Sequence, residues 1–264
     1  MKLSAYVDGL SVIGPGFADW PGASAVLSGR AAHIPAPTIV PVPLSLPPAE
    51  RRRAGRIVSL AIANGTEAAE RAGLAMVSLA AVFSSSGADG DNCHEICQTL
   101  AGVDRQLSPT RFHNSVHNVP AGYWSIATKS MEPSTTLCAY DASFAAGLLE
   151  ALVQVATMNR AVLLVSCDAT YPSPLREKRP ILDSFGTAVA LVPEQSGRSM
   201  ARLAVEIGRN QADTMAEAGL EQLRAGTPGG RALPLLAMLA RGGSGVVTIE
   251  YLDAMTLHGE VQPC

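Results

Sequence analysis

The stretch STTLCAYDASFAAGLLEALVQ, Ser134 to Gln154, reads as a short strand that passes into a helix. The apolar residues from Phe144 onward recur at helical spacing, whereas the first residues are β-branched. Cys138 and Asp141 lie three residues apart where the strand should end and the helix begin. The stretch therefore has the form of a catalytic elbow, in which a helix N-terminus lowers the pKa of a nucleophile.

Strand patterns alternate with helical patterns along the rest of the chain. Strands are expected within 3–14, 75–87, 160–169, 185–194 and 202–208, and a final pair within 245–252 and 255–262. Helices are expected within 19–30, 49–74, 89–102, 142–159, near 212–225 and near 232–241. The order βαβαβαββ predicts an α/β fold, with helices on both faces of a mainly parallel sheet.

Three local signals refine this pattern. Asn64-Gly65 is expected to end or kink the helix of residues 49–74, because this dipeptide breaks the apolar stripe. Asp91 or Asn92 is the expected N-cap of the helix within 89–102. The proline-rich residues 33–48 should form an extended connection, which is too apolar for a free linker and is therefore expected to be pinned to a surface.

Composition excludes several classes of protein. Hydrophobic residues make up 47% of the 264 residues and charged residues 16%, which favours a folded domain with a sizeable core. The net charge of −3 gives no basic field for nucleic acid, and no apolar run is long enough to predict a membrane span. Neither a signal peptide nor disulfides are expected, so the protein should be cytoplasmic with five free thiols: Cys93, Cys97, Cys138, Cys167 and Cys264.

Several strings, in this order, resemble the N-terminal half of the β-ketoacyl synthases, which have the thiolase fold. They are AYVDGLSVIGPG (5–16), LSPTRFHNSVHNVPAGYWSIAT (107–128), LVSCDA (164–169) and ILDSFGTAVALVPE (181–194). The resemblance implies a synthase-like half over residues 1–208. Residues 209–264 would then form a short C-terminal extension that completes the same domain.

A narrower resemblance comes from residues 112–128 and 143–152, FHNSVHNVPAGYWSIAT and SFAAGLLEAL. They look like the short synthase-like proteins of aryl polyene gene clusters, which are similar to chain-length factors. A chain-length factor is a synthase relative that has lost its own catalysis and pairs with an active synthase.

The family register places Asp141, not Cys138, at the nucleophile position when residues are counted back without gaps from Glu150-Ala151 and from the next strand. A carboxylate is a poor acyl acceptor, whereas Asp is a preferred N-cap. Asp141 is therefore expected to cap the helix, and Cys138 to precede it as a buried structural thiol. In the synthases the general base and the oxyanion-hole partners come from the second half of the thiolase fold. Here the only histidine after Gly208 is His258.

The resemblance thus implies a catalytically inactive subunit that forms a heterodimer with an active β-ketoacyl synthase and contacts an acyl carrier protein, without any cofactor. The residues expected at the interface or along an acyl tunnel are Phe112, His113, Asn114, Val116, His117, Tyr123 and Trp124. The alternative is a minimal condensing or acyl-transfer enzyme that uses Cys138 as nucleophile, with His113 or His117 as base.

Three other clusters of polar residues are expected to have no catalytic or metal-binding role. Cys93 and Cys97 are spaced i,i+4 with His94 between them, but structural zinc takes four ligands and no second pair matches. His113 and His117 share that spacing and have no carboxylate nearby in the sequence. No metal site is predicted. The basic cluster Glu50–Arg53 is expected to form the solvated start of a helix. The alternative is that it contacts the acidic face of an acyl carrier protein.

Overall fold

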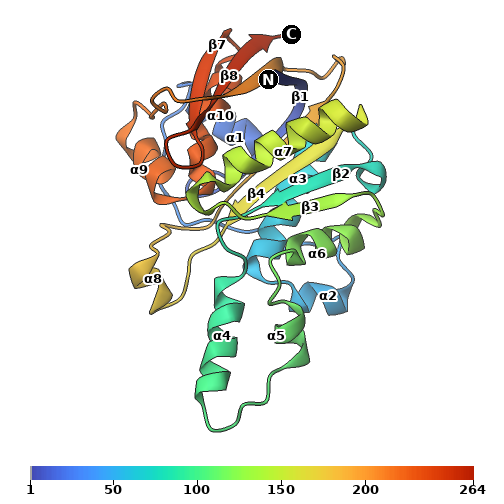
Figure 1. Cartoon of the computed structure of the whole chain (residues 1–264), viewed down its shortest axis with the longest axis vertical. Helices are drawn as coiled ribbons and strands as arrows, with labels where there is room; N and C mark the ends of the chain where they lie inside the picture. Colours follow the sequence, from blue (N-terminus) through green and yellow to red (C-terminus); the bar gives the residue numbers. More distant parts are fainter. Residues whose placement is uncertain (1) are drawn as a thin grey trace.

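The computed structural model describes residues 2–264 and contains one mixed sheet with helices on both faces (Figure 1). The sheet has eight strands in the order β3-β2-β4-β5-β1-β6-β8-β7. Their bounds are β1 Lys2–Ile13, β2 Ala80–Ser84, β3 Ser134–Leu137, β4 Val162–Asp168, β5 Phe185–Val192, β6 Ala201–Gly208, β7 Gly245–Glu250 and β8 Thr256–Pro263. The α/β class is confirmed, as is the order βαβαβαββ as far as β5.

The expectation of a mainly parallel sheet is wrong. Only the pairings of β2 with β3 and with β4 are parallel, and the other five of the seven pairings are antiparallel. A parallel neighbour needs a crossover helix that returns the chain to the same end of the sheet. Between β4 and β5 there is only the four-residue helix α8 (Leu175–Lys178), so β5 runs back beside β4 in the opposite direction.

Helices α3 (Arg56–Ala72) and α6 (Val119–Thr128) cover one face of the sheet. The helix expected over 49–74 is in fact two, because α2 (Pro48–Arg53) ends before Ala54-Gly55. Helix α3 continues through Asn64 and Gly65, where a break was expected. The buried Asn64 amide donates to the Leu60 carbonyl (2.9 Å) and its Oδ1 accepts from Ser11 on β1 (2.9 Å), so this polar residue is satisfied inside the helix.

The other face carries the larger core, formed with α1 (Trp20–Leu27), α7 (Ser143–Met158), α9 (Ala218–Gly226) and α10 (Leu233–Arg241). Helix α7 lies over the parallel strands β2 and β4 (Figure 1). Gly147 allows the close approach, since a Cβ there would stand 2.7 Å from both Leu164 Cδ1 and Ser84 Oγ. The elbow at the start of α7 is therefore held firmly over β2 and β4.

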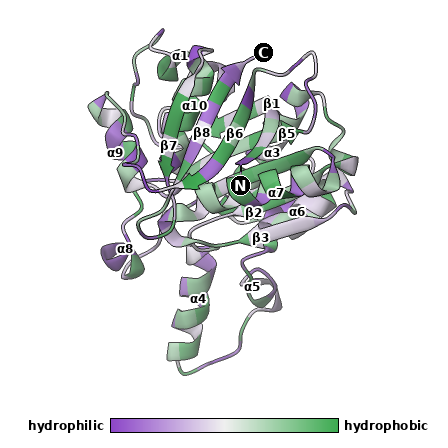
Figure 2. Ribbon diagram, turned by 45° about the horizontal axis from the view of Figure 1, so that its top comes forward, coloured by the Kyte–Doolittle hydropathy of each residue, from purple (hydrophilic) through white to green (hydrophobic). Residues whose placement is uncertain are grey.

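The C-terminal residues extend this same sheet. The expected strand pair is present as β7 and β8, and β8 pairs with β6. One face of this antiparallel end is polar, with Arg202, Glu206, His258 and Glu260 at half-exposed positions and an ion pair between Lys2 and Glu260 at 2.6 Å. Figure 2 shows hydrophilic and hydrophobic residues alternating along β8, as in antiparallel sheets with one solvated face. The division at residue 208 stays a prediction.

Two segments lie outside the layers. Residues 34–43 have no regular structure and are pinned at Thr38, whose N–H donates to Asp183 (2.8 Å) and whose hydroxyl donates to the Ser184 carbonyl (2.7 Å). Helices α4 (Gly90–Ala101) and α5 (Pro109–His113) form an arm that projects from the body (Figure 1). The N-cap of α4 is Asp89, two or three residues before the expected caps. In residues 2–264, no helix is long and apolar enough to cross a membrane.

Candidate functional site

The elbow between β3 and α7 contains a residue with left-handed backbone. After Leu137 the chain passes through Cys138 and Ala139 into a single 3-10 turn, η2 (Tyr140–Ala142), before α7 begins at Ser143. Tyr140 has φ 52°, a conformation that costs free energy for a bulky residue and is concentrated at functional sites. Ser143 fixes the turn, because its Oγ accepts from the Ala139 N–H (3.0 Å) and donates to the Tyr140 carbonyl (2.8 Å).

Asp141 does not cap α7, so that prediction is wrong. The cap position is Ala142, and no side chain bonds to the first turn. The carboxylate of Asp141 pairs instead with two arginines, Arg179 just after α8 and Arg231 in the 3-10 turn η3 (Gly229–Ala232). The distance from Arg231 Nη2 to Asp141 Oδ2 is 3.2 Å. Two guanidinium groups from distant segments attract this carboxylate more strongly than the helix end does.

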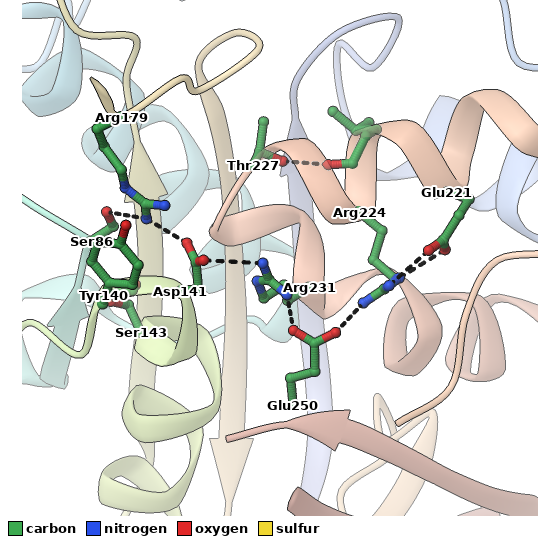
Figure 3. A network of polar contacts seen from close by, with 11 residues as sticks. Ser86, Tyr140, Asp141, Ser143, Arg179, Glu221, Arg224, Thr227, Arg231 and Glu250 are labelled. Carbon is green, nitrogen blue, oxygen red and sulfur yellow. Dashed lines mark hydrogen bonds and ion pairs between the residues drawn. The ribbon is translucent and has the colours of Figure 1, made fainter. Parts of the chain in front are cut away.

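The two pairs belong to a longer chain of alternating charges (Figure 3). Arg231 also pairs with Glu250 at the end of β7, and Glu250 receives Arg224 Nη1 of α9 at 2.8 Å. Arg224 continues to Glu221, with Nη2 and Nε at 2.7 and 2.8 Å from its two carboxylate oxygens. We call this row of three arginines and three carboxylates the charge ladder: Arg179, Asp141, Arg231, Glu250, Arg224 and Glu221. It ties the elbow to the C-terminal residues.

A second carboxyl group lies beside the ladder. Asp168, the last residue of β4, is 1% exposed, and its Oδ1 accepts from the Ser86 N–H at 2.6 Å. Burial raises its pKa to about 7, and this effect outweighs the backbone N–H groups of Ser86 and Gly229 and the charge of Arg179, all of which lower the pKa. Near neutral pH this group therefore exists in both protonation states.

Cys138 comes directly after β3 and precedes the helix, as expected. Its side chain is exposed, so the expectation of a buried thiol is wrong. Its hydrogen-bond partner among residues 2–264 is the Ser85 hydroxyl at 3.9 Å. No histidine bonds to it within the described chain. The buried Cys167 is no better placed for chemistry, because burial raises the pKa of its thiol well above the usual value.

The expected interface residues divide into two groups. Phe112 and Val116 are 68% and 50% exposed, and His113 and His117 are exposed beside them. Tyr123 and Trp124 are only 2% and 1% exposed, which argues against their expected role as surface anchors for a partner. Their expected place along an acyl tunnel stays a prediction. The sequence could have predicted this burial. Four residues recur at helical spacing and form the core-facing stripe of α6: Val119, Pro120, Tyr123 and Trp124.

Asn114 links these two groups. Its amide donates to the Arg53 carbonyl (2.9 Å) and its Oδ1 accepts from the Tyr123 hydroxyl (3.4 Å). It is buried and therefore positions the arm instead of contacting a partner.

Among the described residues, no group of three or more His, Cys, Asp and Glu side chains could hold a metal ion. Cys93 and Cys97 lie exposed on α4.

Next to the arm, a groove of about 500 Å³ runs between α6 and β3. It is lined by small residues of α6 and hydroxyl side chains of β3: Ala121, Gly122, Ser125, Ser134 and Thr136. Strand β3 is the outermost strand of the sheet on this side and pairs only with β2. Its other edge is a free row of backbone donors and acceptors. We call β3, the groove and the arm together the edge surface.

Sequence reasoning missed Arg179 and Arg231. Neither belongs to a motif, and they are 52 residues apart, so only the folded chain brings them to Asp141. A buried helix that begins at a strained strand end, above a mixed sheet, fits the thiolase-like α/β fold that the sequence resemblance predicted. The sequence profile described as β-ketoacyl synthase, N-terminal domain, matches residues 28–248. The chain therefore belongs to the β-ketoacyl synthase family, as the sequence resemblance predicted.

Solved structures with this fold include three that align over nearly their whole length. One is the ketosynthase ApeO in complex with its chain length factor ApeC from Xenorhabdus doucetiae, with TM-score 0.75, 22% identity, and coverage of 98% of this chain and 99% of that chain. Another is the ishigamide ketosynthase/chain length factor, with TM-score 0.73, 14% identity and coverage of 98% and 99%.

The third is AntDE:AntF, a type II polyketide synthase acyl-carrier protein in complex with its ketosynthase bound to the hexaketide, with TM-score 0.75, 9% identity and full coverage of both chains. At these identities the likeness establishes the fold. No curated protein sequence matches the chain significantly.

Proposed function

We propose that this protein is a non-catalytic partner of an active β-ketoacyl synthase and acts as its chain-length factor. The observation that carries the proposal is the chemistry of the elbow. The residue that the family register assigns to the nucleophile position, Asp141, is held between Arg179 and Arg231. A carboxylate stabilised by two cations is a weaker nucleophile than a free one, and the anhydride it would form with an acyl group is labile.

The neighbouring thiol does not replace it. A cysteine nucleophile needs a base or a cation that lowers its pKa. Within residues 2–264, the side chain of Cys138 bonds only to the neutral Ser85 hydroxyl. In the same residues, the side chains of His113 and His117, the two bases of the alternative mechanism, make no hydrogen bond. His258 lies in the middle of β8, at the other end of the strand order. These placements favour the partner role over the minimal enzyme that uses Cys138.

The edge surface supports a protein partner. A free strand edge can be extended by a strand from another chain. The small residues Ala121 and Gly122 leave room for close approach of a second subunit. On the arm, α4 buries none of its apolar side chains and packs mainly against α5. A 12-residue helix is marginal by itself in water, so contact with a partner would stabilise this arm.

The descriptions of the similar solved structures support a partner role of this kind. Two are described as a ketosynthase together with a chain length factor, and a third includes an acyl carrier protein. By analogy we assign Phe112 and Val116 to the wall of an acyl tunnel at the subunit boundary, where their size would limit chain growth. We also propose that Arg51, Arg52 and Arg53, which carry the positive charge of α2, contact the acidic carrier protein.

Co-expression with a full-length β-ketoacyl synthase from the same source tests the proposal. We expect a one-to-one complex by size-exclusion chromatography with light scattering, and product formation that is unchanged when Cys138→Ala is introduced here and lost when the partner's own nucleophile is removed. A stable acyl adduct on Cys138, detected by mass spectrometry after incubation with acyl carrier protein substrate, would instead support the enzyme. A homodimer of this chain that does not bind the synthase would also contradict the proposal.

A further inference from the structure

The surroundings of Asp141 have the composition of an anion-binding site. Arg179 and Arg231 approach the carboxylate from opposite sides, one to each oxygen (Figure 3). Their side chains are only 17% and 15% exposed, whereas surface arginines normally extend into water. Two mostly buried guanidinium groups that meet at one point need an anion between them, because like charges in a low dielectric repel strongly.

Both arginines are held in place independently of Asp141. The guanidinium of Arg179 lies over the Tyr140 ring, 3.6 Å from its centroid, and its Nη2 donates to Ser86 Oγ at 3.1 Å. Arg231 is anchored by Glu250 on its far side. The Nε atoms of both arginines are buried without a hydrogen-bond partner among residues 2–264, so neither guanidinium is fully satisfied by this part of the chain. Contacts other than those with Asp141 therefore help to hold both guanidinium groups in place.

A count of charges shows that Asp141 is the balancing anion. The charge ladder contains three arginines and three carboxylates, so it is neutral with Asp141 and carries one excess positive charge without it. Asp168 is a further carboxyl coupled to Arg179, but burial raises its pKa to about 7, so it is only partly charged at neutral pH. Glu250 and Glu221 are already shared with Arg224.

We propose that Arg179 and Arg231 form a binding site for one small carboxylate, and that Asp141 fills this site as a ligand attached to the chain. The inference does not depend on the partner role. It assigns to Asp141 the work of closing the elbow to carboxylate-bearing molecules and of joining β3 and α7 to the C-terminal residues. If it holds, removal of the side chain should leave a cavity with the charge and shape to bind a free carboxylate.

The test is rescue of Asp141→Ala by formate. The variant should melt about 4–10 °C below the wild type, since a largely buried ion pair has lost one partner. Formate at about ten times its Kd should return about 3–5 °C of this loss by mass action. Sodium chloride at equal ionic strength should not. The wild type, whose site is already filled, should respond equally to the two salts.

Three variants serve as controls. Asp141→Asn keeps the volume without the charge, so it should lose stability but show no response to formate. Glu132→Ala breaks a pair with a single arginine, Arg160 (2.6 Å), and should show no formate-specific effect either. Addition of Arg231→Ala to Asp141→Ala should abolish the rescue. If Asp141→Ala does not fold in chloride, the yield of refolded protein in formate against chloride becomes the readout. Equal effects of formate and chloride on Asp141→Ala, by either readout, would overturn the proposal.

Discussion

The indole ring of Trp124 on α6 lies against the backbone of Gly65 on α3. A Cβ added to Gly65 would stand 2.7 Å from Cζ3 of that ring. The absence of a side chain at Gly65 is therefore what lets Trp124 sink to 1% exposure and lock α6, the base of the arm, against the sheet. The dipeptide expected to break α3 instead makes room for the residue expected to contact a partner.

Gly65→Ala should consequently destabilise the chain although alanine favours helix. Overpacking of a buried contact costs about 1–3 kcal/mol, which exceeds the gain in helix propensity of about 1 kcal/mol or less. The free energy of unfolding from urea denaturation should fall, and near-ultraviolet circular dichroism should report a displaced tryptophan. An unchanged or increased unfolding free energy would mean that Trp124 is not held by Gly65.

Gly122→Ala should have the opposite effect on the isolated chain. Apart from its chain neighbours and the backbone of α6 itself, no atom of residues 2–264 lies within 4 Å of the position that its Cβ would take. The substitution should therefore stabilise α6 by up to about 1 kcal/mol. Because Gly122 lines the groove of the edge surface, the same methyl group should weaken binding of the synthase about tenfold. Isothermal titration calorimetry on the variant measures this, and an unaltered Kd would remove the groove from the interface.

Phe112 and Tyr123 should separate contact with a partner from support of the fold. Phe112→Ala should change the free energy of unfolding by less than about 0.5 kcal/mol, because its ring is exposed. Tyr123→Ala removes a buried ring that bonds to Asn114 and should cost about 3–5 kcal/mol. Urea denaturation of both variants checks this order. A larger loss for Phe112→Ala would show that the arm is folded onto the body.

Asp168 should make stability fall as pH rises. Its pKa of about 7 in the folded chain lies above the ordinary value of 3.8, so between these two values the folded state keeps a proton that the unfolded state has lost. The unfolding free energy should therefore decrease from about pH 4 to pH 7 and level off above it, by about 2–4 kcal/mol from this group. Asp168→Asn, compared with the wild type at pH 5 and pH 8, should remove most of this slope. Parallel slopes would contradict the assignment.

The sequence predicted the elements well because hydrophobic periodicity determines them locally. The strands around Leu164–Val165 and Val189–Ala190 and the helix after Ser143 follow directly from their apolar patterns. The direction of β5 could not be read in this way. It depends on the length of the connection after β4, which contains a single helical turn where a parallel strand would need a full helix.

The candidate site was predictable only in part. The elbow and the position of Cys138 follow from the junction between two patterns, whereas the partners of Asp141 come from segments 38 and 90 residues further along the chain. An acidic residue before a helix is normally a cap. Here two tertiary ion pairs compete with the helix end for the same carboxylate and prevail, and no local pattern contains that information.

The length of the product made by the reconstituted complex tests the proposed role most directly. Complexes of one synthase with the wild-type chain, with Phe112→Ala and with Val116→Ala should be supplied with the same carrier-bound substrates, and the product-length distributions compared by mass spectrometry. At least one of the two variants should form an intact complex and release longer chains, because a smaller side chain opens the tunnel to further carbon units. If both variants form intact complexes whose products match those of the wild type, the chain stabilises its partner without setting the length, and its assignment as a chain-length factor is wrong.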